Sequence, residues 1–189
     1  MGLEAIYAKP RLSQPAEGQT IYPYLLRGVK VDRINQVWSA DITYIPMVHG
    51  FMYLVAILDW FSRYVLSWQL SNTLDSVFCV EALKTALTIA TPEIFNTDQG
   101  VQFTARGFTT TLEAVGSTIS MDGRGRAFDN IFIERLWRSV KYEDIYINDY
   151  ATVLALDQGL QRYFSFYNHD RPHQSLEYRV PAEVHFAEV

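Results

Sequence analysis

The sequence predicts one α/β domain built on a mixed five-stranded sheet flanked by helices. Two observations carry this prediction. Three strand patterns follow one another closely between residues 36 and 70, and after residue 75 helical patterns alternate with short strands. Strands joined by short turns form an antiparallel meander, whereas strands joined through helices run parallel. The sheet is therefore expected to begin antiparallel and to continue parallel.

Side-chain periodicity predicts the three strands of the meander. From Gln36 to Ile45 the residues alternate between two faces, which places Asp41 in mid-strand, where an aspartate is unusual. The apolar run Phe51–Leu58 is typical of a fully buried strand, and a third strand covers about Tyr64–Leu70.

The second half of the domain is predicted to alternate helices and strands. The first helix carries an apolar stripe from Cys79 to Ala90 and ends before Pro92. The later elements are a strand at Ile94–Thr97, a helix at Ala105–Val115 closed by Gly116, a strand at Thr118–Met121, a helix from Asp129 to about Tyr142, and a last helix that Thr152 caps. This order suits a ribonuclease H-like sheet with helices on its faces.

Composition and charge narrow the classes of function. The net charge of -5 argues at first against a nucleic-acid partner, but basic residues gather in two stretches, 1–33 and 124–141. Residues 1–33 are interpreted as an N-terminal arm or linker ahead of a core at residues 34–189. The single cysteine, Cys79, excludes an intrachain disulfide, and the longest apolar run is about half of the roughly 18 to 20 residues that a bilayer span needs. We expect a cytoplasmic protein without a membrane partner.

Three acidic residues occupy positions in the predicted elements that suggest a functional role. Asp41 lies inside the first strand, Asp98 follows the fourth strand, and Glu134 lies on the polar face of the helix after residue 129. Ligands of open α/β sheets gather outside the carboxyl ends of the strands, where Asp98 must point. Oxygen ligands in a small cluster suit Mg²⁺ or Mn²⁺ rather than zinc.

Two such ions can activate a water or a 3′-hydroxyl on one side of a phosphodiester and stabilise the leaving oxygen on the other. In this hypothesis Asp41 bridges both ions, Asp98 completes one metal site and Glu134 completes the other. Each acid also has an ordinary explanation, as an uncommon strand residue, a turn residue and a solvated helix residue. Their joint context favours the catalytic interpretation.

Several segments resemble the catalytic core of insertion-sequence transposases of family three, which are relatives of retroviral integrases. The segments are Gln36–Ile45, Asn96–Phe103, Asp129-Asn130 with Glu134-Arg135 and Lys141, and the closing Tyr167–Leu176. The likeness runs from about Tyr22 to Pro181, and the 35 residues between Asp98 and Glu134 match the spacing of that family's acidic triad.

The resemblance implies a metal-dependent recombinase that cuts the ends of a mobile element and joins them to target DNA. It also implies a homo-oligomer acting on paired DNA ends. Such proteins usually carry an N-terminal helix-turn-helix part for the terminal repeats, and we expect that part outside this sequence or on another polypeptide.

Further DNA contacts are expected near the three acids. Lys141 lies two helical turns after Glu134 and Arg138 lies one turn after it, which places both cations beside the metals and near phosphate. The other candidates are Arg124 and Arg126 on a glycine-containing loop, and Gln99, Asn130 and His173 as DNA contacts or supports of the metal shell. A solvated helix face with a Glu134–Arg138 pair, or an ordinary exposed loop, is the alternative for the basic residues. The four tryptophans are interpreted as core residues.

Other functions stay open on the sequence alone. A catalytically silent remnant that binds DNA or assembles would keep the fold, and a related ribonuclease H-like nuclease would cleave DNA without strand transfer. A glycosidase with paired carboxylates would leave the basic helix face without a role.

Overall fold

The sheet is mixed and five-stranded, as predicted. The computed structural model describes residues 20–48, 50–123 and 130–187. The strands are β1 Val37–Pro46, β2 Phe51–Asp59, β3 Val65–Ser71, β4 Ile94–Thr97 and β5 Thr118–Met121, in the order β3-β2-β1-β4-β5. The meander β1–β2–β3 pairs antiparallel, whereas β4 pairs parallel with β1 and with β5. The helices between the later strands account for this change of direction.

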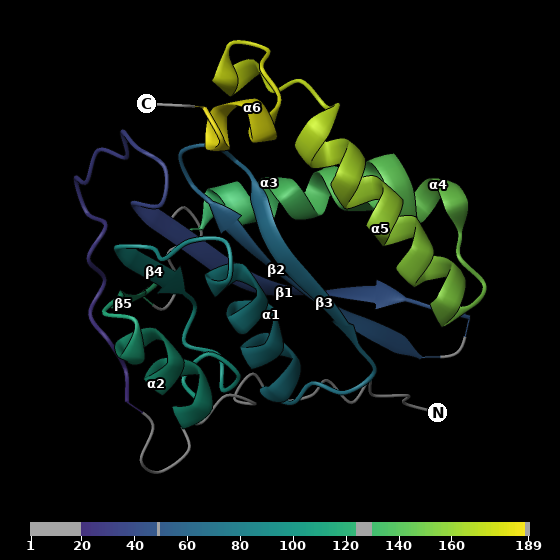
Figure 1. The fold of residues 1–189 in the computed structure, drawn as a ribbon. Coiled ribbons are helices and arrows are strands. Elements are labelled where there is room, and N and C mark those ends of the chain that lie inside the picture. The colour runs from purple at the N-terminus through teal and green to yellow at the C-terminus, as the bar shows by residue number, and fades with distance from the viewer. Residues whose placement is uncertain (1–19, 49, 124–129, 188–189) are drawn as a thin grey trace, which may run out of the picture.

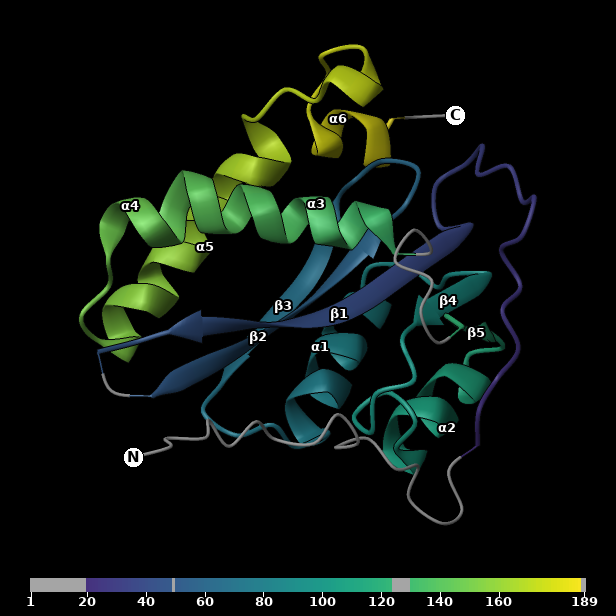
Figure 2. The same cartoon turned by 180° about the vertical axis from the view of Figure 1, so that it is seen from behind.

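Helices cover both faces of the sheet (Figures 1 and 2). On one face lie α1 and α2, and on the other lie α3 and α5. The helical elements are α1 Val77–Leu87, α2 Arg106–Ala114, α3 Ile131–Val140, the π-helix η1 Lys141–Ile145, α4 Tyr146–Asn148, α5 Val153–His169, the 3-10 helix η2 Gln174–Leu176 and α6 Pro181–His185. No helix in the described ranges is long and apolar enough to cross a membrane.

Strand β2 contributes to both cores, and the prediction that it is fully buried is confirmed for residues 54–58 but is wrong for Phe51, which is 59% exposed at the start of the strand. Val55 and Ile57 pack in the cluster under α1 and α2, while Leu54, Ala56 and Leu58 pack in the cluster under α3 and α5. Alternate residues of a strand point to opposite faces, so a strand with helices on both sides must be apolar throughout.

The helix that carries Glu134 is longer and less regular than the sequence predicts. It begins at Ile131, changes at Lys141 from α to π winding, and continues as α4 to Asn148. Within the wider turn Asp144 is buried and accepts hydrogen bonds from the Tyr150 hydroxyl and the Asn148 amide. These hydrogen bonds join polar residues only four and six positions apart, and apolar periodicity does not indicate bonds of this kind.

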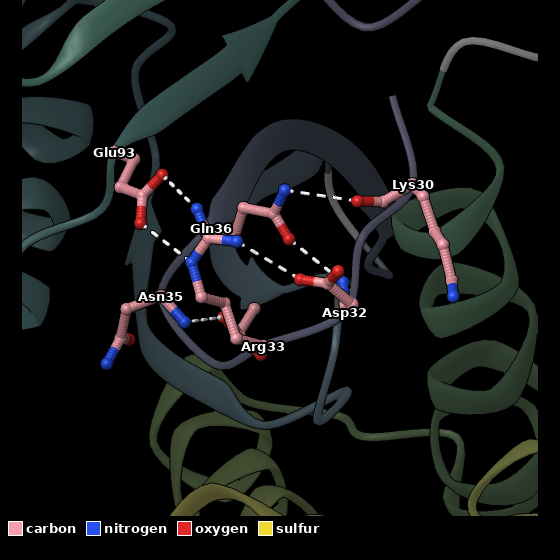
Figure 3. A network of polar contacts seen from close by, with 7 residues as sticks. Lys30, Asp32, Arg33, Asn35, Gln36 and Glu93 are labelled. Atoms are coloured by element: carbon pink, nitrogen blue, oxygen red, sulfur yellow. Dashed lines mark hydrogen bonds and ion pairs between the residues drawn. The ribbon is translucent and has the colours of Figure 1, made fainter. Parts of the chain in front are cut away.

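Residues 20–33 form an extended segment that packs on the core rather than lying free. Leu26 is buried beside Val37 and Trp60, and the Tyr22 hydroxyl donates to Glu113 over 2.7 Å. Figure 3 shows the junction with β1, where the Gln36 side chain joins the backbone of Lys30 and Asp32, and Arg33 forms a two-pronged ion pair with Glu93. Residues 1–19 of the expected arm lie outside the described residues.

Candidate active site

The strand register brings Asp41 and Asp98 together. In the parallel pair of β1 and β4, Ser39 lies opposite Asn96, and paired residues point to the same face of the sheet. Asp41 and Asp98 each follow this pair by two residues. They therefore emerge side by side where β4 ends and β1 continues, on the face that α3 covers.

Both aspartates lie in surroundings that disfavour their charge. Burial raises the pKa of Asp41, hydrogen bonds from Trp137 and the Ile42 amide lower it, and the negative charges of Asp98 and Glu134 raise it, so that the net result is a pKa of about 6. Asp98 is exposed on its outer side, yet the packed atoms beneath it raise the pKa of its carboxyl even though the Gly100 amide donates to it. The electrostatic coupling puts all three acids in one neighbourhood.

Glu134 reaches this neighbourhood from the first turns of α3, where its side chain is exposed. The three carboxylates are not gathered tightly, since the described residues hold no group of three acidic, histidine or cysteine side chains close enough to bind a metal as they stand. Their chemistry nevertheless fits a divalent cation. All the ligands are carboxylate oxygens, and a buried Asp41 between two like charges lacks a compensating positive charge.

Trp137 is the contact that sequence reasoning missed. It is buried, as a core residue should be, but its indole N–H donates to Oδ2 of Asp41 over 2.9 Å. The only signal in the sequence was its position one turn after Glu134 on the same helix.

The two cations predicted beside Glu134 follow it along the same helix, Arg138 within α3 and Lys141 as the first residue of η1. Arg138 is exposed and Lys141 is half-buried at the junction with the π-helix, and α winding up to Val140 keeps both in the row of Glu134. The ion pairs found within the described residues join Arg33 to its two acidic partners and Arg171 to Glu143, so the alternative Glu134–Arg138 pair is not formed.

Gln99 and Asn130 flank the acids. The Gln99 amide donates to the backbone carbonyl of Asp122, which follows β5. Asn130 is buried at the start of α3, and its Oδ1 has no hydrogen-bond partner in the part of the chain that the structure describes. Arg124 and Arg126 lie outside the described residues.

His173 belongs to a different group of side chains. Its ring packs edge-on against Tyr167, and burial together with the charges of Arg171 and Arg63 lowers its pKa to about 4. Arg171 in turn pairs with Glu143 over 2.6 Å, which fastens the end of α5 to η1. The electrostatic partners of His173 are thus Arg171, Arg63 and Glu143 rather than the three acids.

The order of the strands and the helices on both faces of the sheet define the class of fold, which is ribonuclease H-like. The catalytic core domain of HTLV-2 integrase, solved in complex with magnesium in a dimeric form, superimposes with a TM-score of 0.69 at 19% identity over 84% of this chain and 100% of that chain. A chain of the simian T-cell lymphotropic virus intasome in complex with PP2A regulatory subunit B56 gamma gives a TM-score of 0.73 at 17% identity, over 92% of this chain and 61% of that one.

The chain belongs to the integrase core domain family. Two family models described as "Integrase core domain" match residues 31–127 and 115–181. The transposase for insertion sequence element IS904 of Lactococcus lactis is 32% identical over 153 residues, which cover 79% of this chain and 60% of that protein. The transposase for insertion sequence element IS629 of Shigella sonnei is 27% identical over 155 residues, which cover 81% of this chain and 52% of that protein. The chain thus spans a little over half the length of these relatives.

Proposed function

We propose that this chain is the catalytic core of a bacterial DNA transposase, which cleaves the ends of a mobile element and transfers the cut strands to target DNA. The observation that carries the proposal is the position of Asp41 in β1, of Asp98 directly after the neighbouring strand β4, and of Glu134 on α3, the helix whose Trp137 donates to Asp41. The insertion-sequence relatives support the substrate class, since each is named a transposase.

The three carboxylates would hold Mg²⁺ or Mn²⁺, with Asp41 shared between two ions, Asp98 completing one site and Glu134 the other. Divalent ions held there supply Lewis-acid stabilisation of the charge that develops on the transferred phosphate. The magnesium complex of the HTLV-2 integrase core supports this choice of cation. Asp41 and Asp98 would supply carboxylate oxygens from β1 and from the end of β4, and Glu134 would supply the third carboxylate from α3.

The remaining candidates would bind and orient DNA. Lys141 and Arg138, which follow Glu134 along the same helix, would contact backbone phosphates, and Gln99 and Asn130 would contact DNA or support the metal ligands. Arg124 and Arg126 are proposed to follow the phosphate backbone. The dimeric and trimeric forms of the HTLV-2 integrase core support an oligomer as the acting species, with terminal-repeat recognition supplied by a helix-turn-helix part elsewhere.

A strand-transfer assay tests the proposal. A labelled, precut oligonucleotide and a plasmid target are incubated with the chain in Mn²⁺, and the Glu134→Gln variant is compared with Glu81→Gln. Glu81 is exposed on α1, across the sheet, and serves as the matched control. We expect joined product from the parent and from Glu81→Gln, and a loss of at least about 100-fold for Glu134→Gln, because removing one ligand of the transition-state charge costs roughly this much.

The outcomes separate the rival functions. Joined product at the parental level from Glu134→Gln would overturn the assignment of the site. Cleavage without joining would favour a ribonuclease H-like nuclease, and DNA binding with neither reaction would favour a catalytically silent remnant.

A further inference from the structure

Helix α3 brings two neighbouring side chains to the site, of which only Glu134 is an acid. Trp137 lies one turn further along α3 and is 7% exposed. It packs in the cluster that joins α3 and α5 to the sheet. Its Nε1–H donates to Oδ2 of Asp41 over 2.9 Å, across 96 positions of sequence. A single hydrogen bond therefore links the helix that carries Glu134 to the strand that carries Asp41.

This hydrogen bond restricts the carboxylate of Asp41. A carboxylate has about four lone-pair sites, and an indole N–H is a donor that occupies one of them and cannot accept in return. Because packing fixes the indole ring, its N–H fixes the rotation of the carboxylate about the bond to Cβ. The Ile42 amide also donates to this carboxylate, and the remaining lone pairs stay available to a cation.

A purely space-filling tryptophan would not need this contact. Trp60 buries its Nε1 with no hydrogen-bond partner among the described residues, and Trp68 stacks on Phe164 at 5.2 Å in the same core as Trp137. The core of this protein thus accepts tryptophans for their bulk alone, and the aim of the Trp137 N–H at Asp41 is a separate feature.

We propose that Trp137 is a positioning residue, which orients the Asp41 carboxylate for a divalent cation and holds Glu134 at a fixed place relative to it. This inference rests on the proposed function of the two acids. Side chains that hydrogen-bond to metal ligands hold those ligands in the orientation that the metal needs, and Trp137 would do this for Asp41. Removing such a supporting side chain typically weakens metal affinity by about 10- to 100-fold.

The test replaces the N–H and keeps the ring. Benzothienylalanine, which carries sulfur in place of the indole N–H, is placed at position 137 alone, and Trp137→Phe is made as a second variant. Trp68→Phe is the matched control, since Trp68 lies in the same core without touching Asp41. Mn²⁺ binding to each metal-free protein is measured by calorimetry, and strand transfer is measured as a function of Mn²⁺ concentration.

We expect the benzothienyl variant to bind Mn²⁺ about 10-fold more weakly and to need about 10-fold more Mn²⁺ for half-maximal strand transfer. Its rate at saturating Mn²⁺ should approach that of the parent, because the ligands themselves are intact. Trp68→Phe should show neither shift. A loss of packing alone would lower the melting temperature without moving the Mn²⁺ midpoint.

An unchanged Mn²⁺ affinity in the folded benzothienyl variant would overturn the inference, as would a tighter affinity, which would mean that the N–H competes with the cation for Oδ2. Asp41→Asn distinguishes this failure from failure of the proposed function. If Asp41→Asn abolishes Mn²⁺ binding while the benzothienyl variant behaves as the parent, only the role of Trp137 is wrong. If Asp41→Asn binds Mn²⁺ and joins strands normally, the proposed function is wrong.

Discussion

At the scale of single residues, Asp41 is a carboxylate held in surroundings that oppose its charge. Burial and two neighbouring acids raise its pKa to about 6 from an ordinary value of 3.8. Because its folded pKa is the higher one, the folded state binds this proton more tightly than the unfolded chain does. Stability contributed by the protonated form is therefore present below about pH 4 and is lost as the pH rises through about 6.

Asp41→Asn is expected to stabilise the metal-free protein at neutral pH. An uncharged amide avoids the free-energy cost of burying an ionised carboxylate beside two acids. Its oxygen can still accept a hydrogen bond from the Trp137 indole. The shift in pKa corresponds to a gain on the order of 2 kcal/mol in the free energy of unfolding at pH 7.5, or several degrees in melting temperature for a chain of this size. Thermal melts in EDTA at pH 7.5 and pH 4 measure it.

The gain should be largely absent at pH 4, where the parental carboxyl is protonated in the folded state and roughly 40% protonated in the unfolded state. Mn²⁺ should raise the melting temperature of the parent and not that of Asp41→Asn, since a ligand stabilises only a state that binds it. An equal difference between the two proteins at both pH values would contradict the expectation.

At the scale of elements, the change from α to π winding at Lys141 divides one helix into a segment that carries candidate site residues and a segment that buries Asp144. Up to Val140 the α winding keeps Glu134, Arg138 and Lys141 in a row toward the site. In the π-helix that follows, Asp144 turns inward, and the Tyr150 hydroxyl donates to both of its carboxylate oxygens over 3.0 and 3.1 Å. π-helical turns are rare and often accompany functional sites.

Gly159→Ala tests how this turn is supported. Gly159 lies inside α5, and a Cβ there would overlap the hydroxyl and ring of Tyr150. Alanine is intrinsically better in a helix by about 1 kcal/mol, but the overlap is expected to outweigh that gain and destabilise the protein by about 1 to 3 kcal/mol. Urea unfolding of the variant measures the change.

Gly107→Ala is the matched control for this substitution. The nearest atom to a Cβ at Gly107 in α2 is a Val80 methyl at 3.8 Å, so the same change should be neutral or slightly stabilising there. Equal effects at the two positions would show that the Tyr150 contact does not constrain α5.

The elements that the sequence predicted well are those governed by local periodicity. β4 and β5 begin and end at the predicted residues, and Thr152 caps α5 by accepting from the Ala155 amide. The parallel register that joins Asp41 to Asp98 also follows from strand order. The contact of Trp137 with Asp41 could not be predicted, because it depends on a partner that only the tertiary fold supplies. The bonds of Asp144 join nearby polar residues, which apolar periodicity does not indicate. His173 contacts Tyr167 and Arg171, and its expected role as a DNA contact or a support of the metal shell stays a prediction.

At the scale of the whole molecule, the sheet ends on one side in the short strand β5, and residues 20–26 lie against it. The Met121 amide donates to the Pro23 carbonyl, and the Leu25 amide donates to the Ser120 hydroxyl over 3.1 Å. An uncovered edge strand is a template for pairing with another chain. The extended segment therefore shields the edge of the sheet (Figure 2).

A chain that begins at residue 34 is expected to aggregate, whereas one that begins at residue 20 should remain monodisperse. The shorter chain loses the buried Leu26, the Arg33–Glu93 pair and the cover of β5. Size-exclusion chromatography with light scattering compares the two. A monodisperse chain from residue 34 with an unchanged melting temperature would show that the segment contributes little to the core.

The position of this segment also bears on the order of events during synthesis. Tyr22 bonds to Glu113 and Leu25 to Ser120, across 91 and 95 positions of sequence. Residues 20–33 leave the ribosome well before α2 and β5, on which they rest. Contacts between distant parts of a chain form only after the intervening loop has closed. The segment must therefore wait undocked while the sheet assembles, and its docking belongs to the last steps of folding.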